Sequence, residues 1–247
     1  MPRAALEIHV RLQLHPSHFA RKALVLSLPL LGLACSPKAG RPMGPPDAGF
    51  VVSDYFAPAG AMGDGATPGL LTITVDDETK CKPRPSGAKG DCYAFDYAAG
   101  PALFAGLYWQ SPANNWGSSA GVAIRADKLT RVSFQAAVTS GSESMTFEIG
   151  GIGLPTDATL DAQRAAMGEV NSDQFINKDV FNVTGDWQRF SLLIPAPSDP
   201  KKPIRTLLGA FAWYASYPAL PSTTDPATFD YSSLPPKTIF IDDLVYE

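Results

Sequence analysis

The chain has 247 residues, enough for one large domain or two small ones, and its 45% hydrophobic and 18% charged content is that of a globular protein. Residues 1–34 carry a net charge of +3 and the remainder carries −7. The part of the chain after residue 34 is thus acidic and has no basic run. This argues against nucleic-acid binding, which needs Lys and Arg to displace phosphate counterions. All three histidines lie at or before His18, so the rest of the chain has no Ser-His-Asp or Cys-His catalytic group and no imidazole zinc ligand.

The N-terminal region predicts a signal peptide over residues 1–34. Arg21 and Lys22 precede residues 23–34 (ALVLSLPLLGLA), an apolar run too short to span a bilayer comfortably. A buried amphipathic helix is the alternative, but this run has no polar face. We therefore expect residues 1–34 to be removed on export.

The end of the apolar run, residues 31–35 (LGLAC), resembles the lipobox of bacterial lipoproteins. In that family the cysteine is acylated and becomes the new N-terminus, which implies lipidation at Cys35. Gly32 departs from the pattern, because the family usually has Leu three residues before the cysteine. Ser36 stands where Asp would signal inner-membrane retention. The resemblance thus implies an outer-membrane lipoprotein of the cell envelope, periplasmic or surface-exposed.

Two cysteines remain after Cys35, and an even pair in an exported domain predicts a disulfide between Cys81 and Cys92. Two free thiols in a reducing compartment are the alternative, which the leader disfavours. A zinc site is less favoured still, because two cysteines lack partner ligands.

Residues 35–49 contain four prolines and no hydrophobic period, which predicts a tether between the lipidated cysteine and the domain. From residue 50 onward, short apolar or alternating runs recur between turn residues. The predicted strands are residues 50–55, 71–76, 92–98, 104–110, 121–126, 131–138, 145–149, 179–183, 187–194, 206–214 and 238–246.

This strand pattern indicates the fold class. Residues 132–138 alternate as a half-buried strand does, and only residues 157–167 have helical character. About eleven strands with one short helix predict an all-β domain over residues 50–247, an antiparallel β-sandwich or a barrel.

Three segments carry a family resemblance. Residues 106–117 read GLYWQSPANNWG, residues 187–194 follow a Gly-Asp turn, and residues 238–246 read TIFIDDLVY, an apolar strand leading into two aspartates. Together they resemble carbohydrate-binding modules with a galactose-binding-like β-jelly-roll fold. The resemblance implies a non-catalytic monomeric jelly roll whose partner is a polysaccharide or oligosaccharide.

Exposed aromatic side chains are the candidates for sugar contact, because an indole or phenol ring offers a flat apolar surface to the C–H face of a sugar. Trp116 lies in a Pro/Asn loop and is the first candidate, with a loop anchor as the alternative. Tyr108 and Trp109 point to opposite faces if they lie on a strand, so one of them should be core. Trp213 is itself predicted to be core more readily than exposed, and Trp187 is assigned to the core. The predicted carbohydrate-binding residues are Trp116, Asn114, Asn115, Tyr108, Trp109, Gln110, Trp213 and Tyr214.

The resemblance also implies a structural calcium ion, which modules of this fold often hold near their first and last strands. Calcium takes six to eight oxygen ligands, and carboxylates with backbone carbonyls can supply them. One Asp of the consecutive pair near the C-terminus should point inward and needs a partner, either calcium or Arg. The predicted metal ligands are Asp54, Asp64, Asp242 and Asp243.

Catalysis has weaker support in the sequence. Glycoside hydrolysis needs two carboxylates across a cleft, but Glu143 and Glu148 would face opposite sides of one strand. A lyase could be built on Tyr108 and Arg125, but nothing in the sequence groups them. The hypotheses are therefore a glycan-binding jelly roll, a polysaccharide lyase or glycoside hydrolase on the same fold, and a structural envelope protein without sugar binding.

Overall fold

The computed structural model describes residues 49–77, 79–116, 121–151, 175–197, 200–201 and 204–247. The chain divides into two units, Met1–Cys35 and Ser36–Glu247, and everything below concerns the second. The predicted signal peptide, the lipidation at Cys35 and the predicted helix at residues 157–167 lie outside the described residues. Within the described residues, no helix has both the length and the apolar character needed to cross a membrane.

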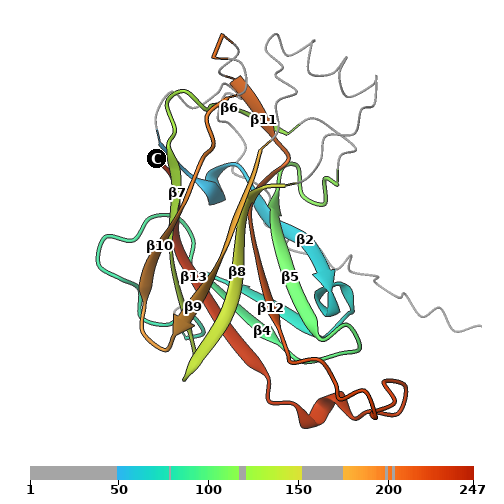
Figure 1. Ribbon diagram of the computed structural model, residues 1–247. Coiled ribbons are helices and arrows are strands. Elements are labelled where there is room, and N and C mark those ends of the chain that lie inside the picture. The colour runs from blue at the N-terminus through green and yellow to red at the C-terminus, as the bar shows by residue number, and fades with distance from the viewer. Residues whose placement is uncertain (1–48, 78, 117–120, 152–174, 198–199, 202–203) are drawn as a thin grey trace, which may run out of the picture. The chain divides into compact units, whose positions relative to one another are not determined.

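One sheet has six strands, in the order β10-β7-β13-β4-β3, with β1 also paired to β13 (Figure 1). Every strand pair in it is antiparallel, and β13 is an inner strand with β7 on one side and β4 on the other. The strands are β1 (Phe50–Val51), β3 (Leu71–Val75), β4 (Tyr93–Tyr97), β7 (Arg131–Val138), β10 (Gln188–Leu193) and β13 (Lys237–Tyr246).

The second sheet has five antiparallel strands in the order β2-β5-β12-β8-β9. They are β2 (Ala57–Gly63), β5 (Phe104–Gln110), β8 (Ser142–Gly150), β9 (Ile176–Thr184) and β12 (Gly209–Ser216). A separate antiparallel pair is formed by β6 (Val122–Arg125) and β11 (Ile204–Leu207). Three short 3-10 helices are η1 (Val52–Asp54), η2 (Asp64–Ala66) and η3 (Tyr231–Ser233).

The hydrophobic core lies between the six-stranded and five-stranded sheets and is rich in aromatic rings. Trp109 of β5 meets Tyr93 and Phe95 of β4 edge-on, with ring centroids 5.1 and 5.7 Å apart. Phe134 of β7 packs on Phe147 of β8 at 4.5 Å. Because these pairs cross from one sheet to the other, the fold is a β-sandwich, which confirms the predicted all-β antiparallel class.

The strand boundaries agree closely where the alternation is clean, as at β5 and β7, which begin and end as predicted. Two predicted strands are wrong: residues 50–55 form only the short β1 before the 3-10 helix η1, and residues 206–214 form two strands that break at Leu208. The sequence does not predict β2, because Pro58, Gly60 and Gly63 disguise it.

Trp187 is not in the main core. It packs from the outer side of the six-stranded sheet on Ala94, Ala137 and Phe240, whose neighbours in each strand point inward to the core. Its indole N–H donates to the Pro83 carbonyl oxygen at 2.7 Å. The assignment of Trp187 to the core is therefore corrected to a contact on the outer face.

The segment between β3 and β4 lies against that outer face. The predicted disulfide between Cys81 and Cys92 is confirmed and closes this segment into a loop. Arg84 of the loop donates to both carboxylate oxygens of Asp242 on β13, at 2.7 and 2.8 Å. Lys82 reaches the Gly185 carbonyl oxygen between β9 and β10. The loop, hereafter the disulfide loop (residues 76–92), is thus fastened to the outer face of the six-stranded sheet.

Candidate functional site

The outer face of the five-stranded sheet carries the candidate site. Along β5, Leu107 and Trp109 point into the core, so Tyr108 points outward. Across the sheet, Ala212 of β12 lies beside Tyr108 on one side and beside Glu148 of β8 on the other. Because Ala212 is small, the Tyr108 ring can extend over it towards Glu148. Tyr214 lies two residues along β12, beside Gly106, and so shares this outward face.

Tyr108, Tyr214 and Glu148 form one hydrogen-bonded cluster, hereafter the Tyr–Glu cluster. The Tyr108 hydroxyl donates to Glu148 Oε1. The Tyr214 hydroxyl lies 3.2 Å from Glu148 Oε2 and 3.2 Å from the Tyr108 hydroxyl, so its proton can serve either acceptor. Tyr108 is 5% and Glu148 7% exposed, whereas Tyr214 is partly exposed and opens the cluster to solvent.

Trp116 lies beside this cluster and is 50% exposed, the largest exposed aromatic side chain among the described residues. Its ring meets Tyr108 edge-to-face with centroids 5.9 Å apart, and Tyr108 meets Tyr214 in the same way at 6.4 Å. The Trp116 backbone N–H donates to the Asn114 carbonyl oxygen, within a turn that follows β5. The aromatic surface on this face therefore runs from Trp116 through Tyr108 to Tyr214, in agreement with the grouping of these residues from the sequence.

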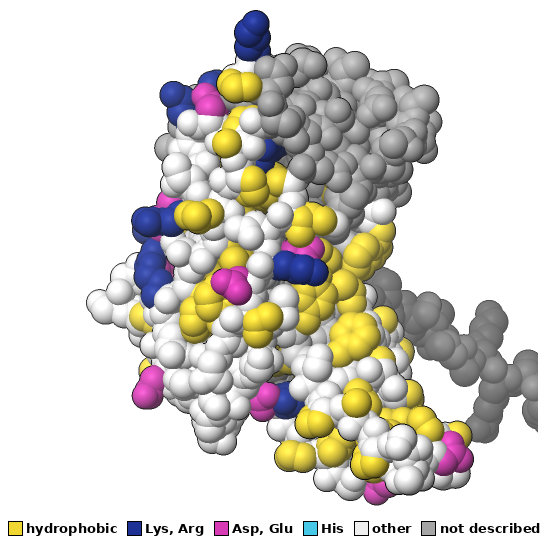
Figure 2. Space-filling view, in the orientation of Figure 1, with side chains coloured by type: hydrophobic (Ala, Val, Ile, Leu, Met, Phe, Trp, Pro, Cys, Tyr) yellow, Lys and Arg dark blue, Asp and Glu magenta, His cyan; other side chains and the backbone are white. Residues whose placement is uncertain are grey.

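Figure 2 shows hydrophobic side chains gathered over this sheet, interspersed with acidic and basic ones. On β9, Lys178 lies opposite Glu148 in the register and is exposed. Ile176 and Val180, two residues to either side on the same strand face, are 58% and 61% exposed. By register, Glu148 and Lys178 are the charged side chains that the described strands of this sheet direct outward.

The electrostatics of the Tyr–Glu cluster keep both of its phenols protonated. Burial raises the pKa of Tyr108 well above its ordinary value, and the hydrogen bond to Glu148 raises it further. Burial also raises the pKa of Tyr214, to about 12. Both phenols therefore keep their protons at neutral pH, whereas a lyase needs a phenolate to act as a base. Glu143, the second carboxylate considered for hydrolysis, forms an ion pair with Lys237 at the start of β13.

Four predicted binding residues are not available at the surface. Trp109 and Trp213 are fully buried between the sheets, and for these two the prediction of sugar contact is wrong. Asn115 is 1% exposed and its side chain donates to the Ser111 carbonyl oxygen, so it anchors the turn. Gln110 is fully buried, although it points to the same face as Tyr108, and its amide has no hydrogen-bond partner within the described part of the chain. Asn114 lies in the turn with a left-handed φ of 61°.

The predicted metal ligands do not come together. No group of three or more His, Cys, Asp or Glu side chains that could hold a metal occurs among the described residues. Asp64 accepts hydrogen bonds from the Tyr97 hydroxyl and from the backbone N–H groups of Gly100 and Ala102. Asp242 is bound by Arg84, and Asp243 by Arg189 at 3.1 Å.

These contacts decide how the buried aspartates are satisfied. The carboxylate of Asp242 does not point into the core as predicted: Ile241 does, and Asp242 lies on the outer face, where its partner is Arg84. A guanidinium group at 2.7 Å repels a cation, and oxygens that already accept N–H or O–H bonds offer poor ligands. The donor set at Asp64, Asp242 and Asp243 therefore does not fit calcium.

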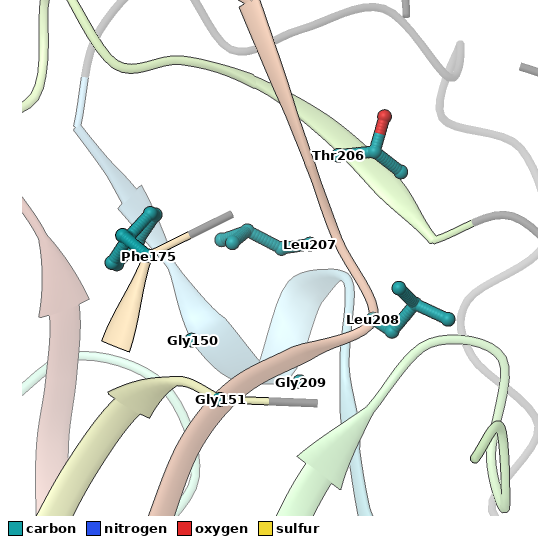
Figure 3. Close-up of a pocket in the computed structure, with 7 residues that line it drawn as sticks. All are labelled: Gly150, Gly151, Phe175, Thr206, Leu207, Leu208 and Gly209. Carbon is teal, nitrogen blue, oxygen red and sulfur yellow. The ribbon is translucent and has the colours of Figure 1, made fainter. Parts of the chain in front are cut away.

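A small hollow adjoins the Tyr–Glu cluster where β8 ends. It is lined by Gly150, Gly151, Phe175, Thr206, Leu207, Leu208 and Gly209. In Figure 3 the Leu207 side chain extends towards Phe175, and Thr206 lies on the other side of β11. A Cβ atom on Gly151 would fall 1.9 Å from Glu148 Oε1 and 2.6 Å from the Tyr108 hydroxyl, so the backbone there touches the cluster. Glycine at this position leaves room for the cluster.

The chain has distant structural similarity to known proteins but no match in sequence. No family model and no curated protein matches it. Among solved structures, a family 11 carbohydrate-binding module from Clostridium thermocellum in complex with a β-1,3-1,4-mixed-linked tetrasaccharide is 11% identical, with a TM-score of 0.32 over 77% of this chain and 96% of that one.

Two family 30 modules are similar to the same degree. One, from a cellulosomal cellulase of Clostridium thermocellum, is 14% identical with a TM-score of 0.38, over 77% of this chain and 92% of that one. The other is 11% identical with a TM-score of 0.41, over 81% and 98%. All of these TM-scores lie below 0.5, so the fold assignment rests on the strand pairing and the aromatic core described above.

Proposed function

We propose that residues 50–247 form a non-catalytic domain that binds a polysaccharide or oligosaccharide on the outer face of the five-stranded sheet. The observation that carries the proposal is the half-exposed Trp116 ring beside the Tyr–Glu cluster. An aromatic ring stacks on the apolar face of a sugar, and adjacent oxygen atoms accept hydrogen bonds from its hydroxyl groups. The family 11 module described above is in complex with a mixed-linked tetrasaccharide, which agrees with this class of partner.

The proposal includes the route to the envelope that the N-terminal sequence predicts. Residues 1–34 act as a signal peptide, and Cys35 is acylated to anchor the domain to the outer membrane. The disulfide between Cys81 and Cys92 supports an oxidising compartment, because such bonds persist outside the reducing cytosol. Mass spectrometry of the protein from the envelope fraction tests the anchor, and an unmodified Cys35 would contradict it.

Glycan-array and affinity-gel binding of the purified chain test the proposed function. Trp116→Ala should weaken binding by about tenfold or more, the loss typical of a central aromatic contact. Trp187→Ala is the matched control, because Trp187 lies on the other sheet and is partly exposed. Its binding should equal that of the unaltered protein.

Three results would overturn the proposal. Release of reducing or unsaturated ends from a polysaccharide would assign the domain to a hydrolase or lyase instead. Equal loss of binding in both tryptophan variants would remove the site from the five-stranded sheet. Absence of binding to every glycan tested would leave a structural envelope protein.

A further inference from the structure

The Tyr–Glu cluster presents hydrogen-bond acceptors to a ligand and withholds donors. The Tyr108 hydroxyl gives its one proton to Glu148 Oε1, and the Tyr214 hydroxyl gives its own to Glu148 Oε2 or to Tyr108. With both protons committed, the phenol and carboxylate oxygens offer only lone pairs. A ligand at this point therefore has to supply the donors.

Glu148 also gives the cluster a negative charge. Oε1 accepts from the Tyr108 hydroxyl and Oε2 lies 3.2 Å from the Tyr214 hydroxyl, so these contacts need no proton on the carboxylate. At 7% exposure, the charge lies where water screens it weakly. A donor that is itself positively charged gains most here, because a charge-assisted hydrogen bond is roughly twice as strong as a neutral one.

The aromatic rings around the carboxylate favour the same kind of ligand. Tyr108 stands nearly perpendicular to Trp116 and to Tyr214, at 84° and 89°. The face of an aromatic ring attracts an ammonium group, most strongly for tryptophan. Trp116 keeps half of its surface exposed for such a contact.

We infer that the glycan recognised here carries free amino groups, as a polymer of de-N-acetylated hexosamine does. This inference rests on the proposed function and names its substrate class. The ammonium group donates to Glu148 and the phenol oxygens, and the adjoining sugar ring packs on Trp116. The Lys178 side chain on β9 repels an ammonium group at this site. Lys178 is exposed, however, and its charge is screened by water, whereas the charge of Glu148 is buried.

The test compares two oligosaccharides of one length, a β-1,4-linked glucosamine hexamer and its fully N-acetylated counterpart. Titration calorimetry of the purified chain, at a pH where the amines are protonated, should show the amine form bound at least about tenfold more tightly. Glu148→Gln keeps the shape and one acceptor but removes the charge. It should reduce that ratio by about tenfold.

Lys178→Gln is the companion variant, and its effect should have the opposite sign. Removal of the opposing cation should raise the ratio about twofold. Near-UV circular dichroism of both variants shows whether the fold is retained.

The outcomes separate this inference from the proposed function. Equal affinity for the two hexamers in the unaltered protein, or tighter binding of the N-acetylated one, overturns the amino-glycan assignment and leaves glycan binding intact. An unchanged ratio in Glu148→Gln overturns the role of that carboxylate. No binding of either hexamer or of any neutral polysaccharide overturns both proposals.

Discussion

The two outer faces of the sandwich carry similar residues in different surroundings. Each carries a tryptophan and a buried carboxylate: Trp187 and Asp242 on the six-stranded sheet, Trp116 and Glu148 on the five-stranded sheet. On the first face, arginine neutralises the carboxylate and the disulfide loop bonds the tryptophan. On the second, the carboxylate has phenols as partners and the tryptophan is half exposed.

The difference shows that residue type alone does not mark a binding site. A carboxylate paired with arginine and fastened under a loop stabilises the fold, and a carboxylate held by phenols on an open face remains able to accept from a ligand. Variants on the first face should therefore change the free energy of unfolding and leave glycan affinity unchanged. Variants on the second should lower glycan affinity.

The largest effect is expected from the disulfide loop. The bond between Cys81 and Cys92 spans 11 residues, and a loop of that length stabilises a fold by about 3 kcal/mol through restriction of the unfolded chain. Replacement of both cysteines by serine should lower the free energy of unfolding by about that amount in urea. Glycan affinity below the transition should not change. A parallel loss of affinity would show that the two faces are coupled.

The ion pair beneath the loop should have a somewhat smaller effect. Asp242 is fully buried, and its hydrogen bonds raise the pKa of Arg84. Asp242→Asn keeps the shape but leaves Arg84 without its charged partner, and because Arg84 is partly exposed we expect a loss of roughly 2 kcal/mol. Thermal unfolding followed by circular dichroism measures it. An unchanged melting temperature would show that the loop is held by its other contacts.

On the outer face of the five-stranded sheet, we expect a substitution at Gly151 to change glycan binding. A Cβ atom there would displace Glu148 and Tyr108, so Gly151→Ala should disorder the Tyr–Glu cluster and weaken glycan binding. Gly141→Ala is the matched control: both glycines have left-handed φ values, 87° and 70°, but Gly141 has open space around its Cα. Both substitutions should cost about 1 to 2 kcal/mol in unfolding free energy from backbone strain. Binding that survives equally in both would place the ligand away from the cluster.

The smallest expected effect is a pH dependence of the free energy of unfolding, caused by Glu247 directly after β13. The Arg131 side chain, by its hydrogen bond, holds the pKa of Glu247 below the ordinary value of 4.5. Because the folded-state pKa is lowered, Glu247 stabilises the fold above pH 4.5, and this contribution is lost as the pH falls through the lowered pKa.

Its size should be less than about 1 kcal/mol, since the pair is partly exposed. Glu247→Gln should accordingly reduce the difference in unfolding free energy between pH 7 and pH 3. An identical difference in the variant and in the unaltered chain would assign this dependence to other carboxylates.

Much of the fold could be predicted because apolar and polar residues alternate along many of the strands, a pattern that is visible within each strand's own sequence. The strand Arg131–Val138 shows it without interruption, and its limits were predicted to the residue. The strand Ala57–Gly63 could not be predicted in this way, because its side chains are small and a proline interrupts it. It pairs with β5, and that tertiary contact overrides its weak local preference.

The site was predictable in part for a related reason. Alternation along β5 separates Tyr108 from Trp109 and predicts that one of the two lies in the core, but the sequence does not select which one. It does not reveal that Glu148 lies across Ala212 from Tyr108, because the order β5-β12-β8 joins segments distant in the sequence. For that reason the sequence indicates for Glu148 only a role as one of two carboxylates in hydrolysis. Arg84 and Arg189 could not be predicted as partners of these carboxylates either, because neither is near Asp242 or Asp243 in the chain.

The place of β13 in the six-stranded sheet has a kinetic consequence. This strand holds β7 on one side and β4 on the other, and its end pairs with β1, the first strand of the sandwich. During synthesis, β4 and β7 are therefore made before the strand that joins them exists, and their edges stay unpaired until residues 237–246 emerge from the ribosome. Such long-range pairing folds slowly, so the nascent domain depends on protection from aggregation until its last strand is available.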